Sequence, residues 1–357
     1  MIKLLIVDDS ALMRRQLTQI FAAAGDFEIS QARNGLDAVE QNRTFKPDVV
    51  TLDINMPEMD GITALSLMMA ERPVPVVMLS SLTEQGALAT FEALNLGAVD
   101  YIAKPGGTIS LSMGDITDEL IAKVRAAARA QLKGKKPGSA GGLVQRLRED
   151  KQKVIGRPMA LRQGVGSAGL VIIGVSTGGP RTLEDILPLL PANFPWPILV
   201  AQHMPGAFTK SFAERLNRVC PLQVVEAASP LPVLPGTIYI AKGGADMVVA
   251  IRAGRLTVLP KPENAQFLWH PSVELLGRSV LEHCDPARVT AVMLTGMGND
   301  GSDAFTDIKK LGGQTIAESE ATAVVFGMPH ELIEKRGASV VLGADKIAAQ
   351  LTLWAGR

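Results

Sequence analysis

Three loops in the second half of the chain each carry one side chain of the set that activates a serine nucleophile. Ser176 follows one apolar run, His203 follows another, and Asp300 lies in a glycine-rich loop after a third. A serine hydroxyl becomes a strong nucleophile when an imidazole takes its proton and a carboxylate orients that imidazole. These residue types predict acyl transfer on esters or amides, a hydrolysis that needs no cofactor.

A second chemically coherent set lies in the first half of the chain. Asp8 and Asp9, then Asp53, then Ser80, then Lys104 follow or end successive apolar runs. Converging carboxylates repel one another unless a hard divalent cation joins them, and Mg²⁺ held in this way commonly engages a phosphate as well. A lysine and a hydroxyl are suitable partners for that phosphate. The set predicts a Mg²⁺-dependent phosphate site.

Parallel sheets are the elements that could bring each set together. Short apolar runs alternate with helical patterns in both halves, which predicts a doubly wound α/β unit in each. Functional side chains of such sheets gather beyond the carboxyl ends of the strands. We expect strands near residues 3–7, 28–32, 48–52, 74–79 and 99–102, and again near 170–175, 197–202 and 289–294.

The charge distribution divides the chain into three parts. Its 357 residues carry 36 basic and 36 acidic side chains. Residues 1–125 hold 10 basic and 17 acidic side chains, residues 133–168 hold 9 and 2, and residues 169–357 hold 16 and 17. The glycine- and lysine-rich stretch at 134–142 is too polar to bury apolar surface. We therefore expect domains at 1–125 and 169–357, joined by a flexible basic linker over 126–168.

Composition also argues against several classes of protein. Cys220 and Cys284 are far apart and in no CxxC spacing, so the chain predicts neither a disulfide framework nor a structural zinc site, and a reducing cytoplasm fits it. No apolar run reaches the roughly 18 residues that cross a bilayer, so no membrane insertion is expected. The basic linker lacks interleaved aromatic residues, which favours a solvated segment over a nucleic-acid site.

The stretch at 174–178 also matches G-x-S-x-G, the nucleophile elbow of α/β-hydrolases. In that fold the histidine follows the acid in the chain, so His203 comes too early and only His330 could serve. A small-molecule serine esterase is therefore an alternative hypothesis.

The glycines at 296–301 match G-x-G-x-x-G, and Glu318 and Glu320 follow about twenty residues later, as in dinucleotide-binding sites. Against this hypothesis, Asp300 would bring a carboxylate close to the pyrophosphate.

The first half resembles a response-regulator receiver domain throughout, in the motifs at 5–10, 52–61, 78–81 and 104–105. The resemblance implies a histidine kinase as phosphodonor. It also implies Asp53 as phosphoacceptor, Asp8 and Asp9 as the acidic pocket with Asp9 on Mg²⁺, the Asn55 carbonyl as a further ligand, Ser80 and Lys104 as sensors of the phosphoryl group, and Tyr101 as the switch aromatic.

The second half resembles the CheB family of chemotaxis protein-glutamate methylesterases/glutaminases, in the motifs at 174–180, 202–205, 271–273, 295–301 and 325–329. A receiver, a linker and this domain form the family's layout. The resemblance implies Ser176 as nucleophile, His203 as general base, Asp300 as its orienting carboxylate, and the backbone N–H groups of Met297 and Thr177 as the oxyanion hole.

The family resemblance implies a phosphorylation-activated hydrolase that demethylates glutamyl methyl esters and deamidates glutamines on chemoreceptor cytoplasmic helices, giving adaptation. It further implies that the unphosphorylated receiver blocks the catalytic cleft. The chain departs from the family pattern at Lys242, Asp246, Trp269 and His270, which puts the receptor partner in doubt. A receiver-linked binding or scaffold protein without hydrolysis stays open as a further alternative.

Overall fold

The computed structural model describes residues 1–81, 83–104, 113–130 and 169–356. The chain forms two compact units, Met1–Lys133 and Gly134–Arg357, and each is described by itself. Of the linker expected over 126–168, residues 131–168 lie outside the described residues. No helix in the described ranges is both long enough and apolar enough to cross a membrane.

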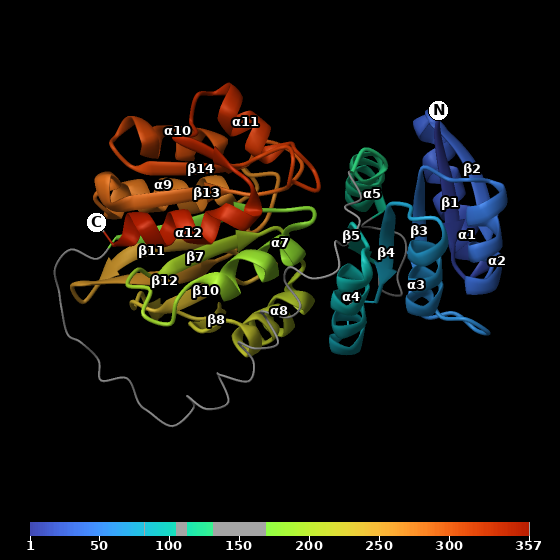
Figure 1. Ribbon diagram of the computed structural model, residues 1–357, viewed down its shortest axis with the longest axis horizontal. Coiled ribbons are helices and arrows are strands. Elements are labelled where there is room, and N and C mark those ends of the chain that lie inside the picture. Colours follow the sequence, from blue (N-terminus) through green and yellow to red (C-terminus); the bar gives the residue numbers. More distant parts are fainter. Residues whose placement is uncertain (82, 105–112, 131–168, 357) are drawn as a thin grey trace. The chain divides into compact units, whose positions relative to one another are not determined.

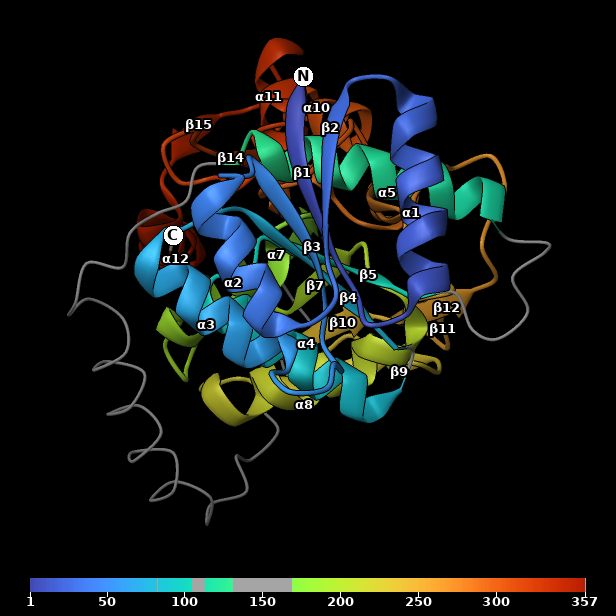
Figure 2. The ribbon, with the colours of Figure 1, turned by 90° about the vertical axis from the view of Figure 1, so that its right-hand side faces the viewer.

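The first unit is built on a five-stranded parallel sheet in the order β2-β1-β3-β4-β5. Its strands are β1 Ile2–Val7, β2 Phe27–Ala32, β3 Val49–Asp53, β4 Val76–Ser80 and β5 Asp100–Ala103. Its helices are α1 Ala11–Ala24, α2 Gly35–Thr44, α3 Gly61–Glu71, α4 Glu84–Leu96 and α5 Met113–Ala128. Helices α1 and α5 cover one face of the sheet, and α2, α3 and α4 cover the other (Figure 2).

Local sequence signals explain where the helix after β1 begins and ends. The Ser10 side chain caps α1 by accepting from the Met13 N–H, and the helix ends at Gly25, whose φ of 79° is a left-handed conformation that glycine adopts easily. The strand order reverses between β1 and β3, so the carboxyl ends of these two strands form the switch point where ligands of such sheets bind.

The second unit is built on a seven-stranded sheet in the order β15-β14-β13-β6-β7-β10-β8, in which every neighbouring pair is parallel. Its strands are β6 Leu170–Val175, β7 Ile198–Gln202, β8 Gln223–Ala227, β10 Thr237–Ala241, β13 Val289–Met293, β14 Gln314–Glu318 and β15 Val340–Leu342. Every residue of β6, β7, β10 and β13 is buried, as expected for a sheet covered on both faces.

Helices cover both faces of this sheet. They are α7 Gly179–Ile186, α8 Gly206–Val219, α9 Val273–His283, α10 Ser302–Lys310, α11 Met328–Glu334 and α12 Ala344–Ala355, with short 3₁₀ turns at Leu187–Leu189 and Pro286–Arg288. Helices α7, α8 and α12 form one group, and α9, α10 and α11 form the other (Figure 1). The predicted fold class, a (βα)₅ unit followed by a doubly wound parallel sheet, is confirmed.

A small antiparallel sheet, ordered β11-β12-β9, was not expected from the sequence. It consists of β9 Leu231–Pro232, β11 Asp246–Arg252 and β12 Arg255–Lys261. The loop between β11 and β12 has two residues, Ala253 with φ 48° and Gly254 with φ 73°, and two positive φ values are characteristic of a type I′ hairpin. Helix α9 packs on β11, and Asp246 at the start of that strand points toward the loop before α9.

Candidate active site

The strand order brings the three candidate catalytic residues to one edge of the seven-stranded sheet. Strand β6 lies between β13 and β7. Val175 at the end of β6 is paired with Gln202 at the end of β7, so Ser176 and His203 leave adjacent strand ends side by side. Asp300 lies in the loop that follows β13 on the other side of β6. The predicted juxtaposition of serine, histidine and aspartate is therefore present.

His203 and Asp300 are in direct contact. His203 Nε2 lies 2.9 Å from Asp300 Oδ2, and their side chains are only 10% and 3% exposed. A carboxylate can only accept, so Nε2 carries the proton and Nδ1 keeps the lone pair. Nδ1 is buried and has no hydrogen-bond partner among the described residues, and it is not bonded to Ser176 Oγ. It is the ring nitrogen left to receive a proton.

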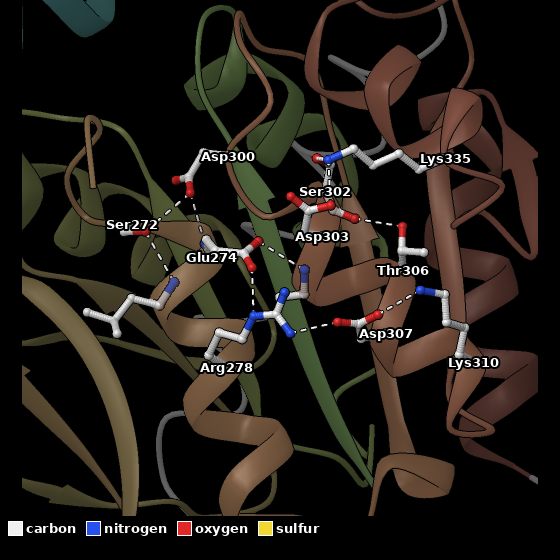
Figure 3. Close-up of polar contacts among 12 residues, drawn as sticks. Ser272, Glu274, Arg278, Asp300, Ser302, Asp303, Thr306, Asp307, Lys310 and Lys335 are labelled. Atoms are coloured by element: carbon white, nitrogen blue, oxygen red, sulfur yellow. Dashed lines mark hydrogen bonds and ion pairs between the residues drawn. The ribbon is translucent and has the colours of Figure 1, made fainter. Parts of the chain in front are cut away.

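Four donors hold the Asp300 carboxylate at the start of α9. Besides His203, the N–H of Val273 lies 2.6 Å from Oδ2, and the N–H of Glu274 and the hydroxyl of Ser272 lie 2.9 and 3.2 Å from Oδ1. Figure 3 shows Asp300 beside Ser272 and Glu274 at this helix end. Backbone N–H groups at a helix start favour a negative charge. These contacts hold the carboxylate with one oxygen directed at the imidazole.

The nucleophile loop is shaped by two glycines and a glutamine. Gly178 has a φ of 78°, and α7 starts at the next residue, so the chain makes a tight turn from strand to helix here. A Cβ on Gly179 would lie 2.0 Å from Gln202 Oε1 and 2.5 Å from a Val175 methyl, so a larger residue would displace the Gln202 side chain. Gln202 Nε2 donates to the carbonyls of both Ser176 and His203, 3.0 Å each. Sequence reasoning assigned Gln202 no role, yet it joins the two catalytic loops.

Thr295 connects the nucleophile loop with the loop that carries Met297. Its hydroxyl donates to the Thr177 carbonyl at 2.8 Å and accepts from the Val325 N–H at 2.9 Å. The Ser176 N–H donates to the Thr295 carbonyl at 2.9 Å. The Met297 N–H has no acceptor among the described residues, which leaves it available for an oxyanion.

The residues behind the two alternative hypotheses have other partners. His330 is half exposed on α11, stacks edge-on against Phe326 and lies 3.8 Å from Glu334. Glu318 is fully buried and accepts from the Thr295 N–H and the Thr322 hydroxyl. Neither arrangement matches the role that the α/β-hydrolase or the dinucleotide hypothesis needs, because His330 is outside the triad and Glu318 is closed to a ribose.

Three of the four residues that depart from the family pattern lie together beside the triad. His270 Nδ1 lies 2.8 Å from Asp246 Oδ1, so two of the departures form a pair. The Trp269 ring lies parallel to the His203 ring, with centroids 6.1 Å apart and 4° between the planes. The sequence marked these residues as departures but did not predict their contacts, because Trp269 and His270 lie in an irregular segment and Asp246 starts a strand far away in the chain.

The acidic residues of the first unit also meet at a sheet edge. One carboxylate oxygen from each of Asp8, Asp9 and Asp53 lies within 4.8 Å of the others. Lys104 Nζ lies 2.8 Å from both Asp8 and Asp53. Oxygen ligands at this spacing are the donor set that Mg²⁺ prefers, so these residues fit the ion, with the exposed Asn55 next to them.

Burial affects Asp53 more than its positive neighbour does. The side chain is nearly inaccessible, and this desolvation raises the pKa of the carboxyl above its ordinary value against the opposing effect of Lys104. Lys104 has a raised pKa, because its contacts with Asp53 and Asp8 outweigh the desolvation that would lower it. The three carboxylates outnumber this single lysine, and a divalent cation would offset the remaining negative charge.

The two candidate switch residues are buried. Ser80 Oγ donates to the Gly86 carbonyl at 3.1 Å and accepts from the Thr90 hydroxyl at 2.8 Å. Tyr101 is only 3% exposed, and burial raises its pKa well above the ordinary value. Ser80 ends β4, the neighbour of β3, and Tyr101 lies one strand further out on β5.

Comparison with known proteins assigns both units. Residues 171–351 match the family described as CheB methylesterase, and residues 4–112 match the response regulator receiver domain. The chain is 53% identical to a protein-glutamate methylesterase/protein-glutamine glutaminase of Rhodospirillum rubrum, over 100% of this chain and 97% of that one. The chain belongs to the CheB methylesterase family.

Further CheB relatives agree with this assignment. A protein-glutamate methylesterase/protein-glutamine glutaminase of Rhodopseudomonas palustris is 50% identical over 99% of this chain and 98% of that one. The solved catalytic domain of Thermotoga maritima CheB methylesterase is 41% identical, with a TM-score of 0.51, and covers 53% of this chain and 100% of that one. This CheB chain is thus a receiver domain followed by a methylesterase domain, and the resemblance inferred from its motifs is confirmed.

Proposed function

We propose that this enzyme hydrolyses glutamyl methyl esters on chemoreceptor cytoplasmic helices, with Ser176, His203 and Asp300 as its triad, and that it deamidates glutamines there. The observation that carries the proposal is the buried His203–Asp300 pair beside Ser176, with one imidazole nitrogen left over. A binding or scaffold protein has no need for a buried histidine held in one tautomer.

In the first half-reaction, Ser176 Oγ attacks the ester carbonyl while His203 Nδ1 takes the serine proton. The resulting imidazolium is stabilised by the Asp300 carboxylate at Nε2. The negatively charged oxygen of the tetrahedral intermediate accepts hydrogen bonds from the backbone N–H groups of Met297 and Thr177. The intermediate then expels methoxide, which takes the proton from His203 and leaves as methanol.

In the second half-reaction, a water replaces methanol. Nδ1 of His203 takes a proton from the water as its oxygen attacks the glutamyl–Ser176 ester. When this second intermediate collapses, the serine oxygen leaves and regains the proton from His203. The products are free glutamate on the substrate and unmodified enzyme. With a glutamine substrate the same steps release ammonia.

For the receiver domain, the proposal assigns phosphorylation to Asp53 with a histidine kinase as donor. Asp8, Asp9, Asp53 and the Asn55 carbonyl would hold Mg²⁺, which offsets the negative charge that the incoming phosphoryl group brings. In this proposal Lys104 binds the phosphoryl oxygens, and Ser80 and Tyr101 respond to them. Phosphorylation would raise the rate of the catalytic domain.

The domain limits are part of the proposal. We place the receiver at 1–125, a basic linker at 126–168 and the catalytic domain at 169–357. Helix α5 extends to Ala128, so the first linker residues are helical. Proteolysis that cuts within 131–168 and leaves both flanking fragments intact would agree with these limits.

The test is methanol release from methylated receptor membranes, with and without a small phosphodonor. The proposal predicts release that the phosphodonor increases and that needs Ser176. A small-molecule esterase would instead cleave soluble methyl esters and leave receptor membranes methylated, and a scaffold protein would release no methanol from either.

A further inference from the structure

The segment before α9 touches two members of the proposed triad, one at each end. At its start, the Trp269 ring lies parallel to that of His203. At its end, the hydroxyl of Ser272 and the N–H of Val273 hold the Asp300 carboxylate. Any shift of this short segment would move both the cover of the imidazole and the carboxylate that orients it.

One buried carboxylate fixes the segment between these ends. Asp246 is 1% exposed, and its Oδ1 lies 2.8 Å from both His270 Nδ1 and the Ser272 N–H. Its other oxygen accepts from the Asn264 N–H at 3.0 Å. Three donors from residues 264–272 therefore converge on a single side chain of β11. His270 is the only side chain among these donors.

The loop of Met297 has a glycine where Trp269 packs. Gly298 has a φ of 86°, and a Cβ at this residue would lie 2.6 Å from the Trp269 ring. The indole thus lies against both the catalytic histidine and the loop that supplies the proposed oxyanion donor. An aromatic ring parallel to the imidazole at this distance can stabilise the imidazolium cation through its π face.

We propose that Asp246 and His270 are a positioning pair that holds Trp269 against His203 and the start of α9 against Asp300. The inference rests on the proposed triad but concerns how the triad is held. Asp246 and His270 act through other residues and do not touch the substrate. Because the imidazolium forms only during the reaction, the pair should affect kcat far more than KM.

The test compares His270→Ala, which removes the donor to Asp246, with His270→Asn, whose amide nitrogen can replace Nδ1. We expect His270→Ala to lower kcat about tenfold with KM within about twofold, and His270→Asn to stay within about threefold of wild type. His283→Ala, at the far end of α9, is the matched control and should keep wild-type kcat. Thermal melts check that each variant is folded.

The labelling rate of Ser176 by a fluorophosphonate separates this inference from the proposed substrate, because it needs no receptor. His270→Ala should slow labelling by a similar factor to kcat. If wild type labels readily but releases no methanol from receptor membranes, the proposed substrate is wrong while the positioning pair is still decided by labelling. Folded His270→Ala that labels and turns over like wild type would overturn the inference.

Trp269 gives a second route to the same decision should His270→Ala not fold. Trp269→Ala should lower the labelling rate and kcat about tenfold, and Trp269→Phe should recover part of the loss. Because His270 acts largely through Trp269, combining both alanine variants should cost little more than either alone. Wild-type rates in Trp269→Ala, or losses that multiply in the double variant, would overturn the inference.

Discussion

Two aspartates lie at the carboxyl ends of central strands of parallel sheets: Asp53 ends β3, and Asp300 lies in the loop after β13. Both are nearly inaccessible, at 3% and 6% exposed over the whole residue. Their surroundings differ. Asp300 receives four hydrogen bonds between 2.6 and 3.2 Å. Asp53 receives one contact of 2.8 Å from Lys104 and a long one of 3.4 Å from the Asn55 N–H. A carboxylate with every lone pair used can only orient a neighbour, whereas one with free lone pairs can react.

Electrostatics sharpens the same contrast. The partners of Asp300 are backbone N–H groups at a helix start, a hydroxyl and an imidazole, which stabilise its charge where it lies. Asp53 shares a single lysine with Asp8, and burial raises its pKa. The hydrogen bonds of Asp300 are therefore satisfied within the protein, whereas Asp53 keeps oxygen lone pairs with which it could bind a cation.

The largest effect is expected at the orienting carboxylate. Asp300→Asn keeps the size of the side chain but replaces one accepting oxygen by an NH₂ group, which is itself a donor. His203 Nε2–H then has no assured acceptor, so the tautomer of His203 is no longer fixed. The analogous change in serine proteases costs about 10⁴-fold in kcat, and we expect a loss of that order in methanol release. Asp303→Asn, whose exposed carboxylate contacts Lys335, is the control. A loss of less than threefold would mean that Asp300 does not orient the base.

The next effect concerns the reactive carboxylate. Asp53→Asn should reduce phosphate incorporation from an acyl phosphate by at least about 100-fold, since the amide is a poor nucleophile. Basal hydrolysis should continue, because the catalytic residues are untouched. Chelating Mg²⁺ should stop phosphate incorporation in wild type. Glu92→Gln, on the exposed face of α4, is the control and should incorporate phosphate like wild type. Labelling that survives in Asp53→Asn would identify another acceptor.

A smaller effect is expected on stability, and it depends on pH. The raised pKa of Asp53 means that folding favours its protonated form, so its charge costs stability above the folded pKa and this cost disappears as pH falls. Without Mg²⁺, Asp53→Asn should therefore melt a few degrees higher than wild type at pH 7, and the difference should vanish below the ordinary value of 3.8. An Asn variant that melts lower at pH 7 would contradict the assigned cause.

The smallest effect tests the connection between catalytic loops. Thr295→Val removes the hydroxyl that bridges Thr177 and Val325, which should cost about 1–3 kcal/mol of stability and lower kcat roughly fivefold. Thr315→Val is a matched control. Its buried hydroxyl bonds to Gly337 and Ser339 at the start of β14, whereas Thr295 contacts Glu318 at the end of that strand. The control should lose similar stability with unchanged kcat, and equal kcat losses in both would refute a specific role for Thr295.

Both sheets, and both sets of candidate site residues, could be predicted from the sequence, because the site residues lie at the ends of strands. Ser176, His203, Asp53 and Lys104 follow buried apolar runs, and parallel order alone places such residues at one edge. Packing in irregular segments has no comparable period. The contacts of Trp269 and His270 could therefore not be predicted, nor could the pairing of His270 with Asp246 on a distant strand.

The sequence also could not predict which ring nitrogen of His203 bonds to Asp300. It depends on the rotamer of one side chain, and on where α9 begins relative to the loop of Asp300. The hairpin of β11 and β12 had a signal in Ala253-Gly254 between two apolar segments, but Ala-Gly is a weaker turn marker than Asn-Gly.

The central claim is that Ser176, activated by a histidine that Asp300 orients, performs the hydrolysis. Ser176→Ala tests this claim most directly. Methanol release from methylated receptor membranes should fall by several powers of ten in the variant, with the melting transition and Asp53 phosphorylation unchanged. Folded Ser176→Ala that releases methanol at a rate near wild type would contradict the account.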